Sequence, residues 1–471
     1  MLIIKILLGL VGLGVVVFVH ELGHFIAARL VGIDVEAFSI GWGRPILAKK
    51  IGGVEYRLGI FPIGGYCKMR GENEFEEAWK NSRGEVKPEK GSFFEVSPAA
   101  RILVAAAGPL FNLLFAVLVF AFTWGIGFEY TTMSNRVVLV SDIFPEEDYP
   151  ATRAGIKTGD RIIEINGKTV ENYRDIQTLI AVNAEKELHF KILREYTPAG
   201  AGADASDGAA GAQSETVDLY ISPEMEKSSG AGRIGVYFWA DPVIESVLPD
   251  SPAAEVGLES GDRVIAVNGE PFAYSVAMLK IVDGEGTRPK SLNIEINRGG
   301  QIINTQLAVP PDDSMPIGIA WQLLRYHTPR YSVFGAVGKG FSEMWDTLVI
   351  SVRSLALLFR GVDLTKAVSG PVRVSYMAGE VAANSFGQSA GEGLRSTANF
   401  LALISIALAV MNLLPLPILD GGLIVLFLIE MIRRRPLNPR FISVYQTAGI
   451  VLIGALMLFA VFGDILFFVQ G

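Results

Sequence analysis

Cysteine and charged residues are both scarce in this chain of 471 residues. Cys67 is the single cysteine, so the chain can form neither an internal disulfide nor a zinc site made of cysteines alone. Only 19% of the residues are charged and 50% are hydrophobic, which excludes an intrinsically disordered protein. Asp and Glu (49) outnumber Lys and Arg (41), giving a net charge of −8. This acidic balance argues against a nucleic-acid partner, since phosphate contacts need a basic surface.

The hydrophobic residues are concentrated in four long stretches, at residues 2–31, 102–128, 400–432 and 442–469. Each is long enough to cross a bilayer, for which about 20 apolar residues suffice. We therefore expect a polytopic α-helical membrane protein with four transmembrane helices, embedded in a lipid bilayer.

The rest of the chain divides into segments between these stretches. Residues 334–359 mix apolar and charged side chains at helical spacing, which favours an amphipathic helix on the membrane surface; a helix of a soluble domain is the alternative. The expected boundaries are 1–32 for the first transmembrane helix, 33–100 for a cytoplasmic-side β-hairpin and loop, 101–129 for the second helix, 130–240 and 241–330 for two external domains, 331–398 for surface helices, 399–432 for the third transmembrane segment, and 441–470 for the fourth helix.

Basic residues indicate how these segments cross the membrane. Four arginines lie in the short connection 433–440, and short basic loops face the cytoplasm. Counting back along the chain, residues 131–330 lie outside the cytoplasm and residues 29–101 lie inside.

The external segment contains an internal repeat with a period of 102 residues. Its first copy, Pro150-Ala151 … Gly159-Asp160-Arg161 … Asn166-Gly167, recurs as Pro252-Ala253 … Gly261-Asp262-Arg263 … Asn268-Gly269. Each copy predicts a short helix, a tight turn, a strand and an Asn-Gly hairpin turn. We therefore expect two α+β domains, the first enlarged by an insertion rich in Ala, Gly and Ser at residues 198–214.

The spacing of the repeat resembles circularly permuted PDZ domains. Such domains bind an extended peptide or a C-terminus as an added strand. Residues 234–236 and 317–319 are the candidate carboxylate-binding loops, but neither has the full Gly-Leu-Gly-Phe pattern. Two roles therefore remain open: binding of peptide ends, or steric filtering without peptide binding.

The first hydrophobic stretch carries a His20-Glu21-Leu22-Gly23-His24 motif. The i, i+4 spacing places both imidazoles on one face of a helix, where they can hold two positions of a tetrahedral Zn²⁺ site. Glu21 lies beside them and is the expected general base for a zinc-bound water. Ionisable groups within a span are costly and point to function.

Two histidines leave zinc short of a protein ligand. Asp420 is the other carboxylate placed inside a stretch rather than towards its end. It follows Pro415 and Pro417, which break the helix, and precedes two glycines. Alone it is also compatible with a proton relay, but with the histidines it favours a His20, His24, Asp420 site open to water. Glu430, beside the arginines, is expected to be solvated.

If a zinc-bound water at this site attacks amide bonds within the bilayer, a helical substrate must first unwind. Residues 46–50 and 54–59 flank Gly52-Gly53 and predict a β-hairpin, whose edge at Tyr56 and Leu58 is the expected site for adding a substrate strand; a plain hairpin is the alternative. Asn412, eight residues before Asp420, is expected either to bind the oxyanion or substrate backbone, or to cap a broken helix.

Together these motifs resemble the site-2 family of intramembrane zinc metalloproteases, peptidase family M50, over essentially the whole chain. Further segments carry the resemblance: 39–43, 62–66, 108–112 and 369–371. Within the family, the chain is similar to the bacterial branch that carries two PDZ-like domains and regulates the sigma-E response.

The resemblance implies a zinc endopeptidase of the bacterial inner membrane, with the PDZ-like domains on the periplasmic side. It implies cleavage of single-spanning membrane proteins, such as anti-sigma factors or remnant signal peptides, after another protease has trimmed them. The alternative from another class is a membrane-anchored PDZ scaffold that binds peptides without catalysis.

Overall fold

The computed structural model describes residues 2–71, 89–146, 148–196, 213–226, 230–283, 288–311, 316–357, 370–435 and 437–470. The chain forms two compact units. The first is built from residues 1–128, 328–359 and 363–471, and the second from residues 129–327. Of the insertion expected at residues 198–214, residues 198–212 lie outside the described residues.

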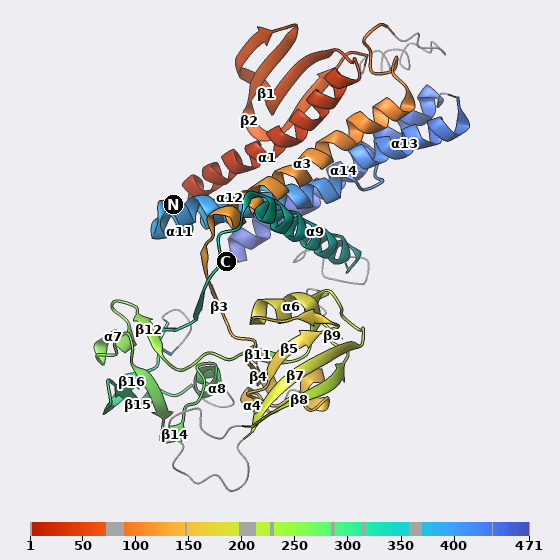
Figure 1. The fold of residues 1–471 in the computed structure, drawn as a ribbon. Coiled ribbons are helices and arrows are strands. Elements are labelled where there is room, and N and C mark those ends of the chain that lie inside the picture. Colours follow the sequence, from red (N-terminus) through yellow and green to blue (C-terminus); the bar gives the residue numbers. More distant parts are fainter. Residues whose placement is uncertain are drawn as a thin grey trace. The chain divides into compact units, whose positions relative to one another are not determined.

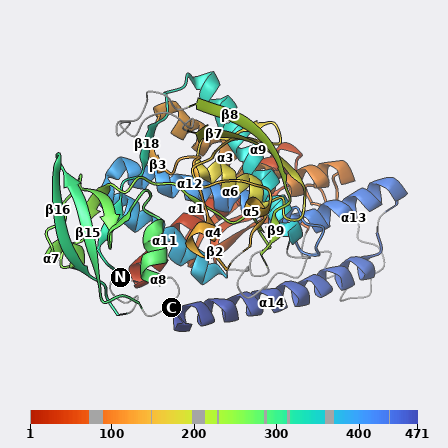
Figure 2. The ribbon, with the colours of Figure 1, turned by 90° about the horizontal axis from the view of Figure 1, so that it is seen from below.

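Long helices make up most of the first unit (Figure 1). They are α1 (Leu2–Leu30), α3 (Pro98–Ile126), α9 (Val333–Leu357), α11 (Pro371–Gln388), α12 (Ala390–Asn412), α13 (Asp420–Arg433) and α14 (Pro439–Gln470). Among the described residues, four helices are long and apolar enough to cross a membrane, at Ile3–Leu30, Pro98–Ile126, Ala390–Asn412 and Val444–Phe467. This number agrees with the sequence prediction. Figure 2 shows α14 at one side of this unit.

The expected third segment, 399–432, consists of two helices, and the break lies around Pro415 and Pro417, where the sequence predicted it. α12 already begins at Ala390, because the Ser389 side chain caps it by accepting a hydrogen bond from the Glu392 amide at 3.1 Å. It ends at Asn412, and after a connection over residues 413–419 the chain continues as α13, which has only 14 residues. A helix of that length spans about 21 Å, less than the hydrocarbon core of a bilayer.

The two helices follow one another along α3. Near the end of α3, Thr123 donates a hydrogen bond to Asn399, early in α12, at 3.0 Å. Near the start of α3, Arg101 forms two 3.0 Å bonds with Glu430, late in α13. α12 and α13 therefore run antiparallel to α3 as one interrupted segment, with its break near the middle of α3.

Strands β1 (Val35–Ile51) and β2 (Val54–Met69) form the predicted hairpin, which is longer than expected. Gly52 and Gly53 make its turn with φ of 58° and 88°, angles that glycine adopts readily. The hairpin folds back on itself: residues 37–40 pair with residues 65–68 and also with residues 55–58, which in turn pair with residues 47–50. The sheet thus has four strand segments, and its two edges are residues 65–69 and 45–51.

Helix α9 forms where an amphipathic helix was predicted, and it packs against α3. Met344 is buried in a cluster with Ala116 and Phe120, and Trp124 donates a 2.5 Å hydrogen bond to Glu343. A position on the membrane surface stays a prediction. Asp464 of α14 accepts bonds from the first amides of α11, which joins these two helices.

The second unit contains two modules of the same topology, as the sequence repeat predicts. Their four-stranded sheets have the orders β6-β5-β7-β8 and β14-β13-β15-β16. The first module contains β4 (Val137–Leu139), α5 (Pro150–Arg153), β5 (Arg161–Ile165), β6 (Lys168–Thr169), α6 (Tyr173–Ala181), β7 (Leu188–Tyr196), β8 (Gln213–Ile221) and β11 (Val236–Phe238). The second contains β12 (Ile244–Val247), α7 (Pro252–Glu255), β13 (Arg263–Val267), β14 (Glu270–Pro271), α8 (Ala277–Asp283), β15 (Ser291–Arg298), β16 (Gln301–Ala308) and β17 (Ile319–Trp321).

The repeated Gly-Asp motif has the same structural task in both modules. Asp160 and Asp262 are buried, and each binds an arginine that lies further along its own module, Arg194 or Arg298, at 2.6–2.9 Å. A buried carboxylate is stable when it is paired in this way. The repeat therefore preserves a folding element, and its identity as a PDZ domain stays a prediction.

Candidate metal centre

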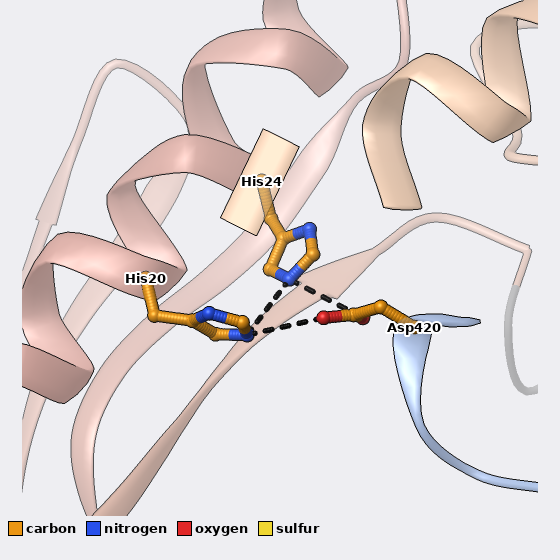
Figure 3. Close-up of side chains that lie close together, drawn as sticks. All are labelled: His20, His24 and Asp420. Carbon is orange, nitrogen blue, oxygen red and sulfur yellow. Dashed lines mark hydrogen bonds and ion pairs between the residues drawn. The ribbon is translucent and has the colours of Figure 1, made fainter. Parts of the chain in front are cut away.

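His20 and His24 lie one turn apart on α1, with their side chains on the same face of the helix (Figure 3). Both are at most 9% exposed. Their Nε2 atoms are 3.2 Å apart, and the ring planes are nearly perpendicular at 84°. The i, i+4 spacing has therefore brought two imidazole nitrogens to one point, as the sequence predicted.

Asp420 reaches the same point from the first turn of α13. Its Oδ2 lies 3.3 Å from Nε2 of His20, and its Oδ1 lies 3.5 Å from Nε2 of His24. These three side chains form the one group of potential metal ligands found among the described residues. The break between α12 and α13 is what places a carboxylate opposite the histidines.

The spacing of these atoms fits a zinc ion. Ligands about 2.0–2.1 Å from a tetrahedral Zn²⁺ lie about 3.3 Å from one another. Nε2 of His20 lies 3.2 Å from Nε2 of His24 and 3.3 Å from Oδ2 of Asp420, and the other oxygen of Asp420 lies 3.5 Å from Nε2 of His24. The buried Oδ2 of Asp420 has no hydrogen-bond partner among the described residues. Two imidazole nitrogens and a carboxylate that converge in this way suit a bound cation.

Glycine lets α3 pack directly over the two imidazoles. A Cβ on Gly108 would lie 2.3 Å from Nε2 of His24, and one on Gly23 of α1 would lie 2.4 Å from the Ala107 carbonyl oxygen. The close contact lets the Val104 carbonyl accept a 2.8 Å hydrogen bond from Nδ1 of His24. α3 thus supplies the partners that orient the ligands.

Glu21 follows His20 on α1 and faces the hairpin. The backbone of Cys67 in β2 hydrogen-bonds to its carboxylate. Gly65 permits this approach, because a Cβ there would lie 3.0 Å from Cγ of Glu21. The strand edge at residues 65–69 is therefore the one that lies beside Glu21.

The other expected site residues separate into two groups. Asn412, the last residue of α12, places Nδ2 3.2 Å from Nε2 of His20, at the ligand cluster. Tyr56 and Leu58 lie inside the sheet: Tyr56 pairs with Phe38 and Lys49, and Leu58 is likewise paired on both sides. The expectation of a free edge at Tyr56 and Leu58 is therefore corrected, because the fold-back covers it.

Two further buried polar residues were not assigned a role by the sequence; one contacts His20 and the other fixes α13 to α3. Asn112 of α3 is fully buried with Nδ2 3.2 Å from Nδ1 of His20. Glu430, expected to be solvated, is only 8% exposed and bound to Arg101, which anchors α13 to α3. An amide within an apolar stretch was a usable signal for Asn112. Nothing local indicates the partner of Glu430.

Two imidazoles, a converging carboxylate and an adjacent glutamate are the groups that zinc hydrolase sites use. Comparison with known proteins gives the family: the model described as Peptidase family M50 matches residues 8–456. The chain belongs to this family and is a zinc metalloprotease.

Its relatives match over nearly their whole length. A Treponema pallidum (strain Nichols) protein named "Putative zinc metalloprotease" is 34% identical over 466 residues, covering 98% of this chain and 99% of the relative. The "Regulator of sigma-E protease RseP" of Escherichia coli (strain K12) is 30% identical, covering 97% of both chains. The "Regulator of sigma E protease" of Haemophilus influenzae is 29% identical with the same coverage.

The position of Asp420 depends on Gly421, and this is testable by metal analysis. A Cβ on Gly421 would lie 2.2 Å from the Leu413 carbonyl oxygen and 2.4 Å from that of Leu414. We expect Gly421→Ala to displace the first turn of α13 and weaken zinc binding about tenfold or more. Zinc per purified chain, measured during competition with a chelator, reports this.

The control is Gly454→Ala in α14, where an added Cβ would meet no atom within 4 Å. It should bind zinc as the wild type does. Equal zinc affinity in the two variants would contradict the role of the glycine.

Proposed function

We propose that this metalloprotease cleaves peptide bonds within the transmembrane segments of single-spanning membrane proteins, after another protease has trimmed their external part. Anti-sigma factors and remnant signal peptides are the proposed substrate types. One observation carries the proposal: the ligands come from α1 and from the break between α12 and α13, not from the second unit. His20 lies ten residues before the end of the span Ile3–Leu30, about 15 Å along the helix.

The proposed location is the bacterial inner membrane, with residues 131–330 on the periplasmic side. The names of the Escherichia coli and Haemophilus influenzae relatives support a sigma-E-type regulatory role. The four arginines within residues 433–440 support a cytoplasmic position for the connection before α14.

We assign roles from the positions of the side chains. His20, His24 and Asp420 hold the zinc, which when bound polarises a carbonyl and lowers the pKa of a bound water. Glu21 accepts the proton of the attacking water and passes it to the leaving nitrogen. The Asn412 amide, next to His20, either donates a hydrogen bond to the developing oxyanion or grips the substrate backbone.

The Glu21→Gln variant tests catalysis. We expect it to keep zinc, because the three ligands are intact, and to lose activity by about 10²–10⁴-fold, the usual contribution of a general base. Cleavage of a trimmed single-span protein in detergent or liposomes is the measurement, and His24→Ala is the control expected to lose both zinc and activity. Undiminished cleavage by Glu21→Gln would contradict the role of Glu21 as the general base.

We propose that the substrate unwinds by adding as a strand along residues 65–69. Within the described sheet this segment pairs on one side, with residues 35–40, and its Cys67 backbone contacts Glu21. Strand addition satisfies the backbone groups of an unwound segment, which cannot otherwise be left unpaired inside a membrane. The edge at residues 45–51 belongs to the opposite side of the same sheet and serves as an internal comparison.

Crosslinking in the Glu21→Gln background separates the two edges. Replacement of Tyr66 by a photoreactive benzoylphenylalanine should capture the uncut substrate, because Tyr66 lies on the edge beside Glu21. The same replacement at Lys49, on the opposite edge, should capture little. Equal capture at both positions would contradict the choice of edge.

A second proposed activity is binding of a peptide end by the second module. A cavity of about 620 Å³ is lined by Ile319 and Trp321 of β17, by Leu279 and Val282 of α8, and by Gly318 in the loop before β17. The arrangement of a strand edge beside an apolar helix suits an added peptide strand.

The first module differs at the corresponding edge. There the Tyr173 hydroxyl donates a 2.6 Å hydrogen bond to the Val236 carbonyl of β11. The Gly235 carbonyl accepts from Val140 on the β4 side, so Val236 presents its carbonyl to the other side of the strand. The position that a peptide amide would use is therefore occupied, and steric filtering is the role left for this module.

A labelled decapeptide ending in a free valine carboxylate is the probe for the second module. We expect the full-length protein to bind it at least tenfold more tightly than the same peptide with an amidated end, because the loop amides select a carboxylate. Leu279→Lys in α8 should abolish binding, whereas Gln177→Lys, the matching position of α6, should not. Loss of binding in both variants would contradict the assignment.

A further inference from the structure

Both histidine ligands have their second ring nitrogen directed at α3. Nδ1 of His24 lies 2.8 Å from the Val104 carbonyl oxygen, and Nδ1 of His20 lies 3.2 Å from the side-chain amide of Asn112. A neutral imidazole carries one proton, so the partner of Nδ1 decides whether Nε2 has a lone pair for the metal.

The tautomer of His24 is fixed by chemistry. A backbone carbonyl can only accept a hydrogen bond, so the Val104 oxygen requires the proton on Nδ1 of His24. Nε2 of His24 then presents its lone pair toward His20 and Asp420, at 3.2 and 3.5 Å.

The partner of His20 is ambiguous because an amide can donate or accept. With Nδ2 toward His20, the Asn112 side chain requires the proton on Nε2, where it would point at the other ligands. In that orientation Oδ1 of Asn112 is buried without a hydrogen bond among the described residues. Leaving a buried acceptor unpaired costs about 1–3 kcal/mol.

A half-turn of the amide, whose oxygen and nitrogen have nearly the same shape, directs the acceptor at Nδ1 of His20 and places Nδ2 where Oδ1 had no hydrogen-bond partner. Oδ1 then accepts from Nδ1–H of His20, and Nε2 presents a lone pair 3.2 Å from Nε2 of His24 and 3.3 Å from Oδ2 of Asp420. Ser405 of α12 holds the residue in place by donating a 3.1 Å hydrogen bond to the backbone carbonyl of Asn112.

We propose that Asn112 is a positioning residue that selects the metal-binding tautomer of His20 by accepting its Nδ1–H through the side-chain oxygen. Asn112 touches neither the metal position nor the substrate edge, so it acts through His20. The proposal rests on the assignment of His20, His24 and Asp420 as zinc ligands.

Two substitutions of similar size distinguish a side chain at position 112 that accepts a hydrogen bond from one that donates a hydrogen bond or only fills space. Asn112→Asp keeps an acceptor and loses the donor, whereas Asn112→Leu loses both. We expect Asn112→Leu to weaken zinc binding by about 10–100-fold, as loss of an orienting partner does, and Asn112→Asp to bind within about threefold of the wild type. Zinc affinity of the purified full-length protein, measured by chelator competition without substrate, is the readout.

Asn399→Leu is the matched control. It removes another amide between α12 and α3, but its partner Thr123 keeps a 3.0 Å hydrogen bond to the Val119 carbonyl. This variant should bind zinc normally. Wild-type affinity in Asn112→Leu, or an equal loss in Asn112→Asp and Asn112→Leu, would overturn the proposal.

His20→Ala distinguishes failure of this proposal from failure of the ligand assignment. Zinc affinity should fall more in His20→Ala than in Asn112→Leu. An unchanged affinity in His20→Ala would refute the ligand set itself, whatever the Asn112 variants show, and cleavage assays play no part in either decision.

Discussion

Imidazole and carboxylate groups buried among apolar helices are costly unless each polar atom has a partner, and the arrangement around α3 meets this constraint. The Val104 carbonyl and the Asn112 amide take the outer nitrogens of the two histidines. The inner nitrogens and the Asp420 carboxylate then converge on one another. A divalent cation held by these three groups would satisfy them at once, and the contacts with α3 would then orient its ligands.

The interruption between α12 and α13 follows from the same constraint. If α12 continued without a break, its helical geometry alone would fix the position of Asp420 along the helix axis and the face on which its side chain lies. Instead the chain turns through residues 413–419, where Ile418 has a φ of 77°, a conformation costly for a β-branched residue. Gly421 then fits against the Leu413 carbonyl, and the Arg101–Glu430 pair fixes the far end of α13. The turn at Ile418 before α13 and the ion pair of Glu430 near its end together fix the position of the Asp420 carboxylate.

The features that local spacing determines could be predicted from the sequence. A histidine pair at i, i+4, a two-glycine turn and a 102-residue repeat each depend on a few neighbouring residues, and the structure contains all three arrangements. Asp420 could be singled out because a carboxylate between helix breakers in an apolar stretch must be buried in protein or line a cavity. The ligand set remains a proposal, but its geometry suits the zinc of this family.

Features that depend on long-range pairing could not be predicted. From the sequence, Tyr56 and Leu58 are expected at an exposed edge, but residues 37–40 pair with residues 55–58 and cover them. The hydrophobic pattern of the sequence does not indicate this second pairing. Glu430 lies near arginines in the sequence, yet its partner Arg101 is 329 residues away. In both cases a distant segment decides whether a group is exposed or buried.

The two repeated modules show which constraints a duplicated sequence preserves. The buried aspartate and its arginine are the same in both, because removing the arginine would leave a buried carboxylate without its ion pair. The strand edge is under no such constraint. Tyr173 closes it in the first module, whereas Ser275 takes the corresponding position and lines the open cavity in the second. Two modules of the same fold therefore differ in whether this strand edge is occupied by a side chain of the module itself.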